Sequence, residues 1–383
     1  MIYFDNSATT KPSQGVVAIM ERVLKEDFGN PSSMHMKGME AENYIKDAAG
    51  KLAKILHCKE KELIFTSGGT ESNNMAIIGT AFAKKRRGKH IITSAMEHAS
   101  VYEPMRFLEE EGFEVTYLPG NEKEVVDLEA LKAALRPDTI LVSIMQVNNE
   151  TGRLSRVEEI GKILHEYNPE IVYHVDAIQS FGKYRIHPKK QGIDLLSVSG
   201  HKIHGPKGSG FLYCREKLTI KPLILGGGQQ AGMRSGTENV PAIAGMGEAA
   251  KEIYDHFEEV QGHLYDLKNT MISELLKLPD VTVNSFCGQD SAPHIVSASF
   301  KGVRSEVLLH ALEGKGVYVS SGSACSSNHP AISKTLQTIH VPEELLDSTI
   351  RFSFCGENTE EEIETTIEIL KELLPMLRKF TRH

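Results

Sequence analysis

The sequence predicts an α/β protein with a large domain built on a mostly parallel sheet and a smaller α+β domain at the C-terminus. From about residue 16 to about residue 215, amphipathic helical patterns alternate with short apolar runs. Strands separated by helices form βαβ units, in which the strands run parallel and helices cover both faces. After about residue 240 this alternation ends, and 383 residues are enough for a second hydrophobic core.

The elements of the large domain follow one another in a regular order. Helices are expected at residues 16–25, 41–56, 73–85, 101–111, 128–135 and 157–167. Strands are expected at residues 63–66, 90–93, 115–118, 139–146, 171–176 and 194–198. Parallel sheets of this kind bind ligands at the carboxyl ends of their strands.

The C-terminal part has a different pattern. Residues 242–276 form one long helical pattern, with a break expected near Gly262. The strands and helices expected after it are 281–284, 296–300, 305–315, 318–320, 349–353 and 360–379. We expect the large domain to span residues 14–254, and the small domain to combine residues 1–13 with 255–383.

Composition and charge exclude several classes of protein. The net charge of -8 gives no basic surface for nucleic acid. No apolar run approaches the roughly 18 residues of a membrane helix, and the N-terminus has no signal or transit pattern. The five cysteines are scattered without a C-x-x-C pair, which argues against a zinc site or disulfides. We therefore expect a cytoplasmic protein with no metal site, membrane contact or direct nucleic-acid contact.

A lysine and an aspartate follow two neighbouring strands. Lys202 comes after the strand at 194–198 and before the glycine-rich stretch 205–210. Asp176 ends the strand at 171–176, and Gln179 lies just beyond it. A lysine amine can bind pyridoxal 5'-phosphate (PLP) covalently, and a carboxylate can keep the PLP ring nitrogen protonated so that the ring accepts electrons. This pair therefore predicts a PLP site.

Residues 66–74, which include Thr70, follow a strand and open a helix. Backbone N–H groups at a helix start, together with a hydroxyl, form a cradle for a phosphate. The same residues also fit a capping box, with Thr70 or Ser67 as the cap and Glu71 in the first turn. Lys202 and Asp176 favour the phosphate interpretation.

Two further strand ends carry polar side chains with alternative interpretations. His98 follows the strand at 90–93 and is either a structural hydrogen-bonding residue or a residue that stacks on a ring and moves protons. Asn149 follows the strand at 139–146 and lies either in a polar turn or against a ring substituent.

Thr237 and Arg351 also have two interpretations each. Thr237 lies in a stretch, 234–239, that follows three glycines, and it provides either a helix cap or a second phosphate-binding hydroxyl. Arg351 lies in an apolar strand, where it either pairs with a structural carboxylate or binds a substrate carboxylate through two hydrogen bonds.

Cys325 lies among small, polar, turn-forming residues at 320–328. Free cysteines are usually small buried hydrophobic residues, but these neighbours predict a mobile, exposed thiol. The other four cysteines lie in apolar or ordinary surroundings and are expected to be inert.

In this order and spacing, the motifs resemble the PLP-dependent cysteine desulfurases of the NifS/IscS type, which belong to the class-V aminotransferases of fold-type I. The likeness runs through nearly the whole chain, in motifs at residues 3–10, 28–35, 67–74, 97–98, 148–150, 176–179, 199–202, 234–239, 321–325 and 351–353. Gly69 stands where many relatives have alanine, and residues 328–334 and 354–358 differ from the better-known members.

The resemblance implies a role for each matching residue. Lys202 would carry PLP, Asp176 would pair with its ring nitrogen, and His98 would stack on the ring and share the proton transfer. The ring hydroxyl region would be bound by Gln179 and Asn149. The phosphate would be held by Gly69, Thr70, Ser199 and His201, with Thr237 supplied by the partner subunit of a homodimer. Arg351, with Asn149, would bind the substrate.

The resemblance also implies the reaction. L-cysteine would be converted to L-alanine, and Cys325 would hold the sulfur as a persulfide. The sulfur would then pass to an acceptor protein, such as an Fe–S scaffold or a tRNA thiolation enzyme. The alternatives are a selenocysteine lyase, another fold-type I aminotransferase, which would have no use for Cys325, and a non-catalytic sulfur-transfer scaffold, which the intact Lys202 and Asp176 disfavour.

Overall fold

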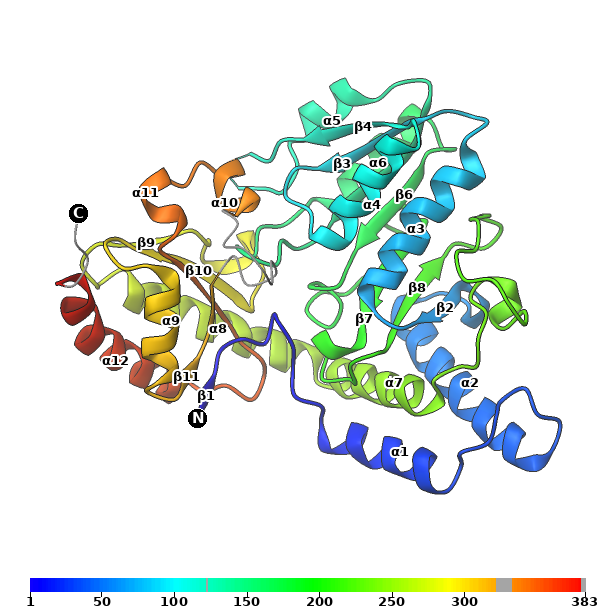
Figure 1. The fold of residues 1–383 in the computed structure, drawn as a ribbon, viewed down its shortest axis with the longest axis horizontal. Helices are drawn as coiled ribbons and strands as arrows, with labels where there is room; N and C mark the ends of the chain where they lie inside the picture. Colours follow the sequence, from blue (N-terminus) through cyan, green and yellow to red (C-terminus); the bar gives the residue numbers. More distant parts are fainter. Residues whose placement is uncertain (122, 322–332, 380–383) are drawn as a thin grey trace.

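The computed structural model describes residues 1–121, 123–321 and 333–379 (Figure 1). Its largest element is a seven-stranded sheet in the order β2-β8-β7-β6-β5-β3-β4. A four-stranded sheet in the order β12-β13-β10-β9 and the strand pair β1-β11 lie in a second, smaller part of the molecule. The fold class predicted from the sequence is confirmed.

The first part of the chain forms the helices and strands that the sequence predicts, with ends shifted by a few residues. Its helices are α1 (Gln14–Lys25), α2 (Met36–Leu56), α3 (Gly69–Lys84), α4 (Ala99–Glu110), α5 (Leu128–Ala134), α6 (Val157–Tyr167) and α7 (Val240–Asp255). Its strands are β2 (Leu63–Thr66), β3 (His90–Ser94), β4 (Glu114–Leu118), β5 (Thr139–Met145), β6 (Val172–Asp176), β7 (Leu195–Ser199) and β8 (Gly210–Cys214).

Side chains that alternate along the strands build a separate core on each face of the large sheet. Leu141 of β5 packs in one core, whereas its neighbour Val142 packs in the other. The core that contains Leu141 is closed by apolar residues of α3 and α4, and the other by residues of α2, α6 and α7. This two-sided burial explains why the central strands read as continuous apolar runs.

Strand β8 was not predicted, because it begins at the end of the glycine-rich stretch. It runs antiparallel to both of its neighbours, β2 and β7. A Cβ atom on Gly210 would lie 2.6 Å from the Val198 carbonyl oxygen and 2.7 Å from Gly68 Cα. A glycine at this position therefore lets β8 approach the residues that open α3.

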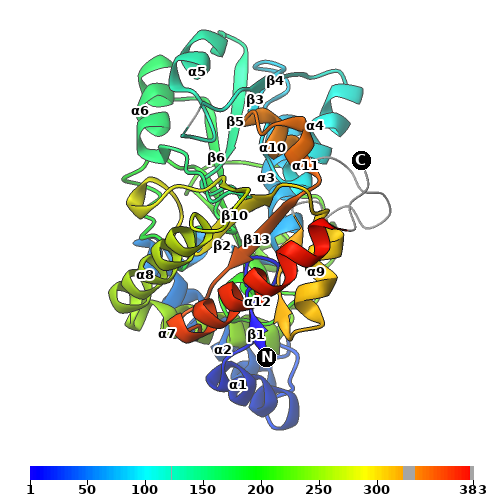
Figure 2. The same ribbon diagram turned by 90° about the vertical axis from the view of Figure 1, so that its left-hand side faces the viewer.

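The smaller part is built mainly from the C-terminal residues. Its elements are α8 (Phe257–Leu275), β9 (Val281–Val283), β10 (Ile295–Phe300), α9 (Ser305–Glu313), β11 (Val317–Tyr318), β12 (Ser320–Ser321), α10 (Lys334–Thr338), α11 (Glu343–Leu346), β13 (Thr349–Ser353) and α12 (Glu360–Arg378). Figure 2 shows α8, α9 and α12 in front of β10 and β13, on the outer side of the small sheet.

Two details of this part correct the sequence-based expectations. The helical pattern at 242–276 breaks at His256, whereas Gly262 lies inside α8 with open space around it. The break at His256 lets α8 leave the large core and bury its apolar side chains in the small one. The strand expected at 318–320 is two short strands, because β11 pairs with β1 and β12 pairs with β13.

The N-terminal segment packs against the smaller part, as expected. Strand β1 (Ile2–Tyr3) pairs in parallel with β11, and Phe4 is buried in the small core. In Figure 1 this segment then crosses towards α1 and the large sheet. The domain boundaries at 14–254 and at 1–13 with 255–383 stay a prediction. Among the residues described, no helix combines the length and the apolar character needed to cross a membrane.

Candidate active site

A cavity of about 460 Å³ opens at the carboxyl ends of β5, β6 and β7. Its other wall comes from the N-terminal segment and the small sheet, through residues such as Asp5, Ser7 and Ser320. The predicted site residues that line it are Gly69, Thr70, His98, Asn149, Asp176, Gln179, Ser199, His201, Lys202 and Arg351. The fold therefore brings together ten side chains and backbone positions that lie far apart in the sequence.

Lys202 lies in a short 3-10 turn that follows β7. Its Nζ donates hydrogen bonds to the carbonyl oxygens of Ser7 and Ala8, the latter at 2.9 Å. These carbonyls belong to the N-terminal segment, which therefore holds the amine at the cavity wall. Carbonyl groups carry no full charge, so they hold the amine without neutralising it.

Asp176 is the last residue of β6, and its side chain is only 4% exposed. One carboxylate oxygen accepts a hydrogen bond from the backbone N–H of Ile178 at 2.9 Å, and the other from Asn73 Nδ2 at 2.8 Å. Burial raises the pKa of Asp176, while these two hydrogen bonds oppose that rise. A cationic group bound in the cavity would therefore stabilise the ionised carboxylate.

His98 is the N-cap residue of α4, so the structural interpretation of this histidine is correct as far as it goes. Its Nδ1 accepts a hydrogen bond from the backbone N–H of Ser100 at 3.1 Å, and the Ser100 hydroxyl lies 2.9 Å from the same atom. Burial lowers the pKa of His98, so the imidazole is neutral. Because Nδ1 is an acceptor, the proton of the neutral ring is on Nε2.

Asn73 connects these groups, although no sequence pattern predicted a role for its side chain. Its Nδ2 donates to Asp176 and also to the Ser100 hydroxyl at 2.9 Å, and its side chain is fully buried. Its position in the 66–74 motif was the only sequence signal. A chain of hydrogen bonds therefore runs from Asp176 through Asn73 and Ser100 to His98.

The start of α3 has no side-chain cap. Gly68 is its N-cap residue, so neither Thr70 nor Ser67 caps the helix. The Glu71 carboxylate accepts a hydrogen bond from the Ser67 backbone N–H at 2.8 Å and pairs with Arg234 at 2.9 Å. The N–H groups of the first turn are thus available to an anion, as the phosphate interpretation requires.

Gly69 makes room at the same place. A Cβ atom at this position would lie 2.1 Å from Ile178 Cδ1. An alanine at position 69 therefore requires Ile178 to move. His201 lines the same cavity, and burial lowers its pKa to about 4, so it is neutral at pH 7.

Arg351 lies on β13 with only 6% of its surface exposed. It pairs with Asp5 at 2.9 Å, as the structural interpretation expected, and donates to the Asn149 carbonyl oxygen at 2.9 Å. Its buried Nε has no hydrogen-bond partner among the residues described. The guanidinium therefore combines a structural ion pair with an unused donor.

Two predicted residues do not line the cavity as described. Thr237 is exposed in its loop, and the helix cap after it is Asn239, which accepts from the backbone N–H of Ala242 at 3.3 Å. The interpretation of Thr237 as a helix cap is therefore wrong. Cys325 lies outside the described residues, although Ser320, at the cavity wall, precedes it by only five positions.

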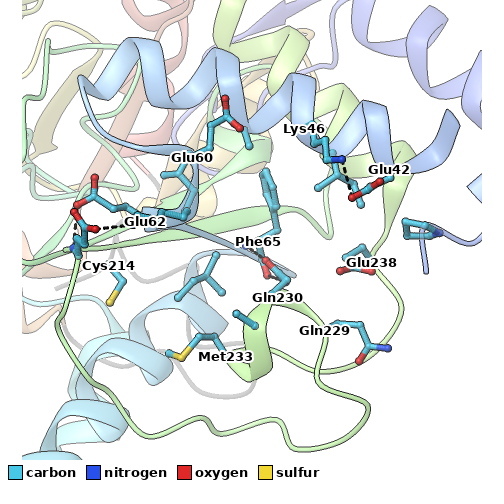
Figure 3. Close-up of a pocket in the computed structure, with 18 of the residues that line it drawn as sticks. Glu42, Lys46, Glu60, Glu62, Phe65, Cys214, Gln229, Gln230, Met233 and Glu238 are labelled. Atoms are coloured by element: carbon cyan, nitrogen blue, oxygen red, sulfur yellow. Dashed lines mark hydrogen bonds and ion pairs between the residues drawn. The ribbon is translucent and has the colours of Figure 1, made fainter. Parts of the chain in front are cut away.

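A second cavity, of about 670 Å³, lies between α2, β2, β8 and the loop at 229–238 (Figure 3). Gln230 lies beside the edge strand β2, where its amide donates to and accepts from the Phe65 backbone at 2.8 and 2.6 Å. On the α2 side of this cavity, Glu42 and Lys46 form an ion pair at 2.8 Å. None of the predicted site residues lines this cavity.

Residues 2–366 match the family described as aminotransferase class-V. The chain belongs to this family. It is 45% identical to the cysteine desulfurase IscS of Dictyoglomus turgidum, over 98% of this chain and 95% of that protein. It is 43% identical to the cysteine desulfurase IscS of Methanosarcina thermophila, over 99% and 93% of the two chains.

Solved structures agree with these sequence matches. A NifS-like protein superposes with a TM-score of 0.93 at 38% identity, covering 98% of this chain and all of the other. A structure described as SspA in complex with cysteine has a TM-score of 0.81 at 34% identity, covering 94% and 100%. The predictions of a fold-type I enzyme and of a cysteine desulfurase of the NifS/IscS type are confirmed.

Proposed function

We propose that this class-V enzyme binds PLP through Lys202 and transfers the sulfur of L-cysteine to Cys325. The observation that carries this proposal is the meeting of the Lys202 amine and the buried Asp176 carboxylate in one cavity beside the uncapped start of α3. An amine, a carboxylate that favours a cationic partner and an anion cradle match the aldehyde, the ring nitrogen and the phosphate of PLP.

The residues divide the binding of the cofactor among them. Asp176 would pair with the ring nitrogen, while Asn73 and the Ile178 backbone keep its carboxylate in place. The phosphate would be bound by Gly69, Thr70, Ser199 and His201, and the ring hydroxyl region by Gln179 and Asn149. When bound, PLP supplies an electron-withdrawing ring that makes the substrate α-proton acidic.

The proton is moved by this chain's own groups. We expect Lys202 Nζ or His98 to take the α-proton, and His98 would stack on the ring. His98 is neutral because burial lowers its pKa. To accept the proton at Nε2, the ring would first have to move its own proton from Nε2 to Nδ1 and give up the hydrogen bond from the Ser100 backbone N–H. Arg351, which lines the cavity, would bind the substrate carboxylate together with Asn149.

The sulfur transfer needs no external oxidant. The Cys325 thiolate attacks the substrate sulfur, the carbon–sulfur bond breaks, and the carbon keeps the electron pair and takes up a proton. L-alanine leaves, and Cys325 carries the sulfur as a persulfide. An acceptor protein for Fe–S assembly or for tRNA or cofactor thiolation then removes the sulfur, in agreement with the IscS names of the relatives.

The quaternary structure and location that we propose are a cytoplasmic homodimer. Thr237 is exposed and absent from the cavity of its own chain, which supports a role at the phosphate of the partner subunit. The four cysteines in the described residues are free thiols, as expected in a reducing compartment.

Substitution of Lys202 tests the proposal directly. We expect Lys202→Ala to fold as judged by circular dichroism, but to lose the visible absorbance of covalently bound PLP and the release of alanine from L-cysteine. Lys207→Ala, an exposed lysine in the following loop, is the matched control and should keep both properties. Alanine release by Lys202→Ala at a near wild-type rate would show that the assignment is wrong.

A further inference from the structure

The side-chain amide of Gln179 is held between two fixed groups. Its Nε2 donates to the Ser7 carbonyl oxygen at 3.0 Å, and its Oε1 lies 3.3 Å from His294 Nε2. Gln179 is 8% exposed and His294 is 3% exposed. Because water cannot readily reach these groups, losing either hydrogen bond would leave a buried polar atom without a partner. No sequence pattern predicted a role for His294.

The chemistry of the two partners determines which atom donates and which accepts in each hydrogen bond between Ser7, Gln179 and His294. The Ser7 carbonyl only accepts, so it requires the NH₂ side of the amide. The amide oxygen then faces His294 and also only accepts, so the proton of the imidazole is on Nε2. His294 Nδ1 is buried without a partner among the described residues, which fits a lone pair in a neutral ring.

This arrangement leaves one N–H of the Gln179 amide unused at the cavity. An amide rotated by 180° would place its oxygen against the Ser7 carbonyl and its NH₂ group against the His294 N–H. The first contact would then join two acceptors and the second would join two donors. Both buried contacts, which are now hydrogen bonds, would become repulsive. The same Ser7 carbonyl oxygen also accepts a hydrogen bond from Lys202 Nζ. The orientation of the Gln179 amide is therefore linked to the position of the reactive amine.

We propose that His294 is a positioning residue that locks the Gln179 amide so that an N–H, and not the oxygen, points at the ring oxygen of PLP. This inference rests on the proposed function, in which Gln179 contacts the ring hydroxyl region. An N–H at that oxygen favours its ionised form and thereby sets the electronic state of the ring. His294 touches neither the substrate nor the reacting atoms in this role.

Two substitutions at position 294 separate this role from simple packing. His294→Phe keeps a flat ring of similar size but has no donor, whereas His294→Gln places an amide N–H at a similar reach. We expect His294→Phe to shift the visible absorbance band of bound PLP, to move the pH midpoint of that band, and to weaken PLP binding about tenfold. His294→Gln should restore all three towards wild type.

A double mutant shows whether His294 acts through Gln179. On a Gln179→Ala background, His294→Phe should cause no further change in the band, its pH midpoint or PLP affinity, because the group that it orients is gone. Equal effects in both backgrounds, or a wild-type spectrum and affinity in folded His294→Phe, would refute the positioning role. If His294→Phe does not fold, a spectral shift in His294→Gln as large as that in Gln179→Ala would refute it as well.

The outcome of these experiments is distinct from a failure of the proposed function. Wild-type protein that acquires no visible band with PLP would contradict the proposed cofactor itself. A normal band in wild type, lost in Lys202→Ala but unchanged in His294→Phe, would leave the cofactor assignment intact and remove only the role of His294.

Discussion

At the scale of single residues, small amides do much of the positioning in this site. Asn73 uses both hydrogens of its NH₂ group, one on the Asp176 carboxylate and one on the Ser100 hydroxyl, which in turn contacts His98. The carboxylate expected at the ring nitrogen and the imidazole expected to stack on the ring are thus connected before any ligand arrives. Hydrogen bonds to the ionised form of Asp176 offset part of the cost of burying it.

The role of Cys325 is testable by a single-atom change. We expect Cys325→Ser to retain PLP and bind L-cysteine but to form no protein persulfide, because only a thiolate accepts the sulfur. Mass spectrometry after incubation with L-cysteine should show one added sulfur on wild type and none on the variant. Sulfur found on Cys58, Cys214, Cys287 or Cys355 would contradict the assignment.

A buried lysine in the small core predicts a pH-dependent stability. Lys268 of α8 is fully buried, donates to Ser291 Oγ and to the Ala292 carbonyl at 2.6 Å, and has a pKa lowered to about 7 by burial. The ordinary lysine pKa is about 10.4, so between about pH 7 and 10 the unfolded chain binds one more proton than the folded chain. The free energy of unfolding therefore rises with pH in this range. Below about pH 7 the lysine is charged in the folded chain as well, so the full destabilisation from burying its charge is present.

Lys268→Met removes this titration. The difference in free energy of unfolding, wild type minus variant, should increase between pH 7 and 9, by up to about 1.4 kcal/mol per pH unit. Urea unfolding at several pH values measures this difference. Lys277→Met, which replaces an exposed lysine just after α8, is the control. A difference that does not change with pH would show that Lys268 is not deprotonated by burial.

At the scale of elements, the sites are built where a strand ends and a helix begins. Helices α3 and α4 start beside the cavity, and strands β5, β6 and β7 end there. Helix α10 belongs to the same group, because its N-cap residue Ser333 accepts from the Leu336 backbone N–H at 3.1 Å and donates to the Glu150 carboxylate. Glu150 directly follows Asn149 of the cavity wall.

Ser333 is thus the first described residue after the segment that contains Cys325, and it is tied to the cavity wall. Ser333→Ala removes both the cap and the contact with Glu150, at a cost of about 1 kcal/mol or more. We expect the yield of Cys325 persulfide to fall several-fold while PLP content is unchanged. Asp127→Ala, which removes the equivalent cap of α5, is the control and should leave the yield as in wild type. Equal yields for the two variants would contradict the expectation.

At the scale of the whole molecule, one chain leaves several large apolar side chains exposed. Phe28 and Met34, between α1 and α2, are 72 and 100% exposed, Met36 and Met39 in the first turns of α2 are 69 and 51% exposed, and Leu225 is 79% exposed. Exposed apolar side chains that lie close together are typical of an interface. They support the proposed homodimer, in which the loop that carries Thr237 reaches the partner.

Mixing two impaired variants tests the shared site. If Thr237 acts across the interface, a dimer of one Lys202→Ala chain and one Thr237→Ala chain places both lesions in the same cavity. Half of the sites in a mixed dimer then carry both lesions, and the other half carry none. We expect activity after subunit exchange to exceed that of either parent, and a hydroxyl-to-phosphate bond predicts about tenfold weaker PLP retention in Thr237→Ala alone. No recovery after confirmed exchange, or a monomer in light scattering, would contradict this arrangement.

The sequence by itself determined which local segments form helices and strands, because burial on one or both faces imposes a period on the apolar residues. It also placed the reactive residues near strand ends, since Lys202, Asp176, His98 and Asn149 each lie at the end of an apolar run or within five residues after it. Strand β8 was missed because its glycine serves a close approach to Gly68, a distant neighbour that leaves no periodic signal.

Only the tertiary structure decided which partners hold these residues. The carbonyl oxygens that bind Lys202 come from residues 7 and 8, the carboxylate on Arg351 comes from Asp5, and the donor on Gln179 comes from His294. Each of these contacts joins segments more than a hundred residues apart, so no spacing or pattern in the chain encodes it. The sequence determines the reactive groups through local periodicity, whereas their partners, hydrogen-bond directions and pKa values depend on burial, which arises only when the sheet, the small part and the N-terminal segment pack together.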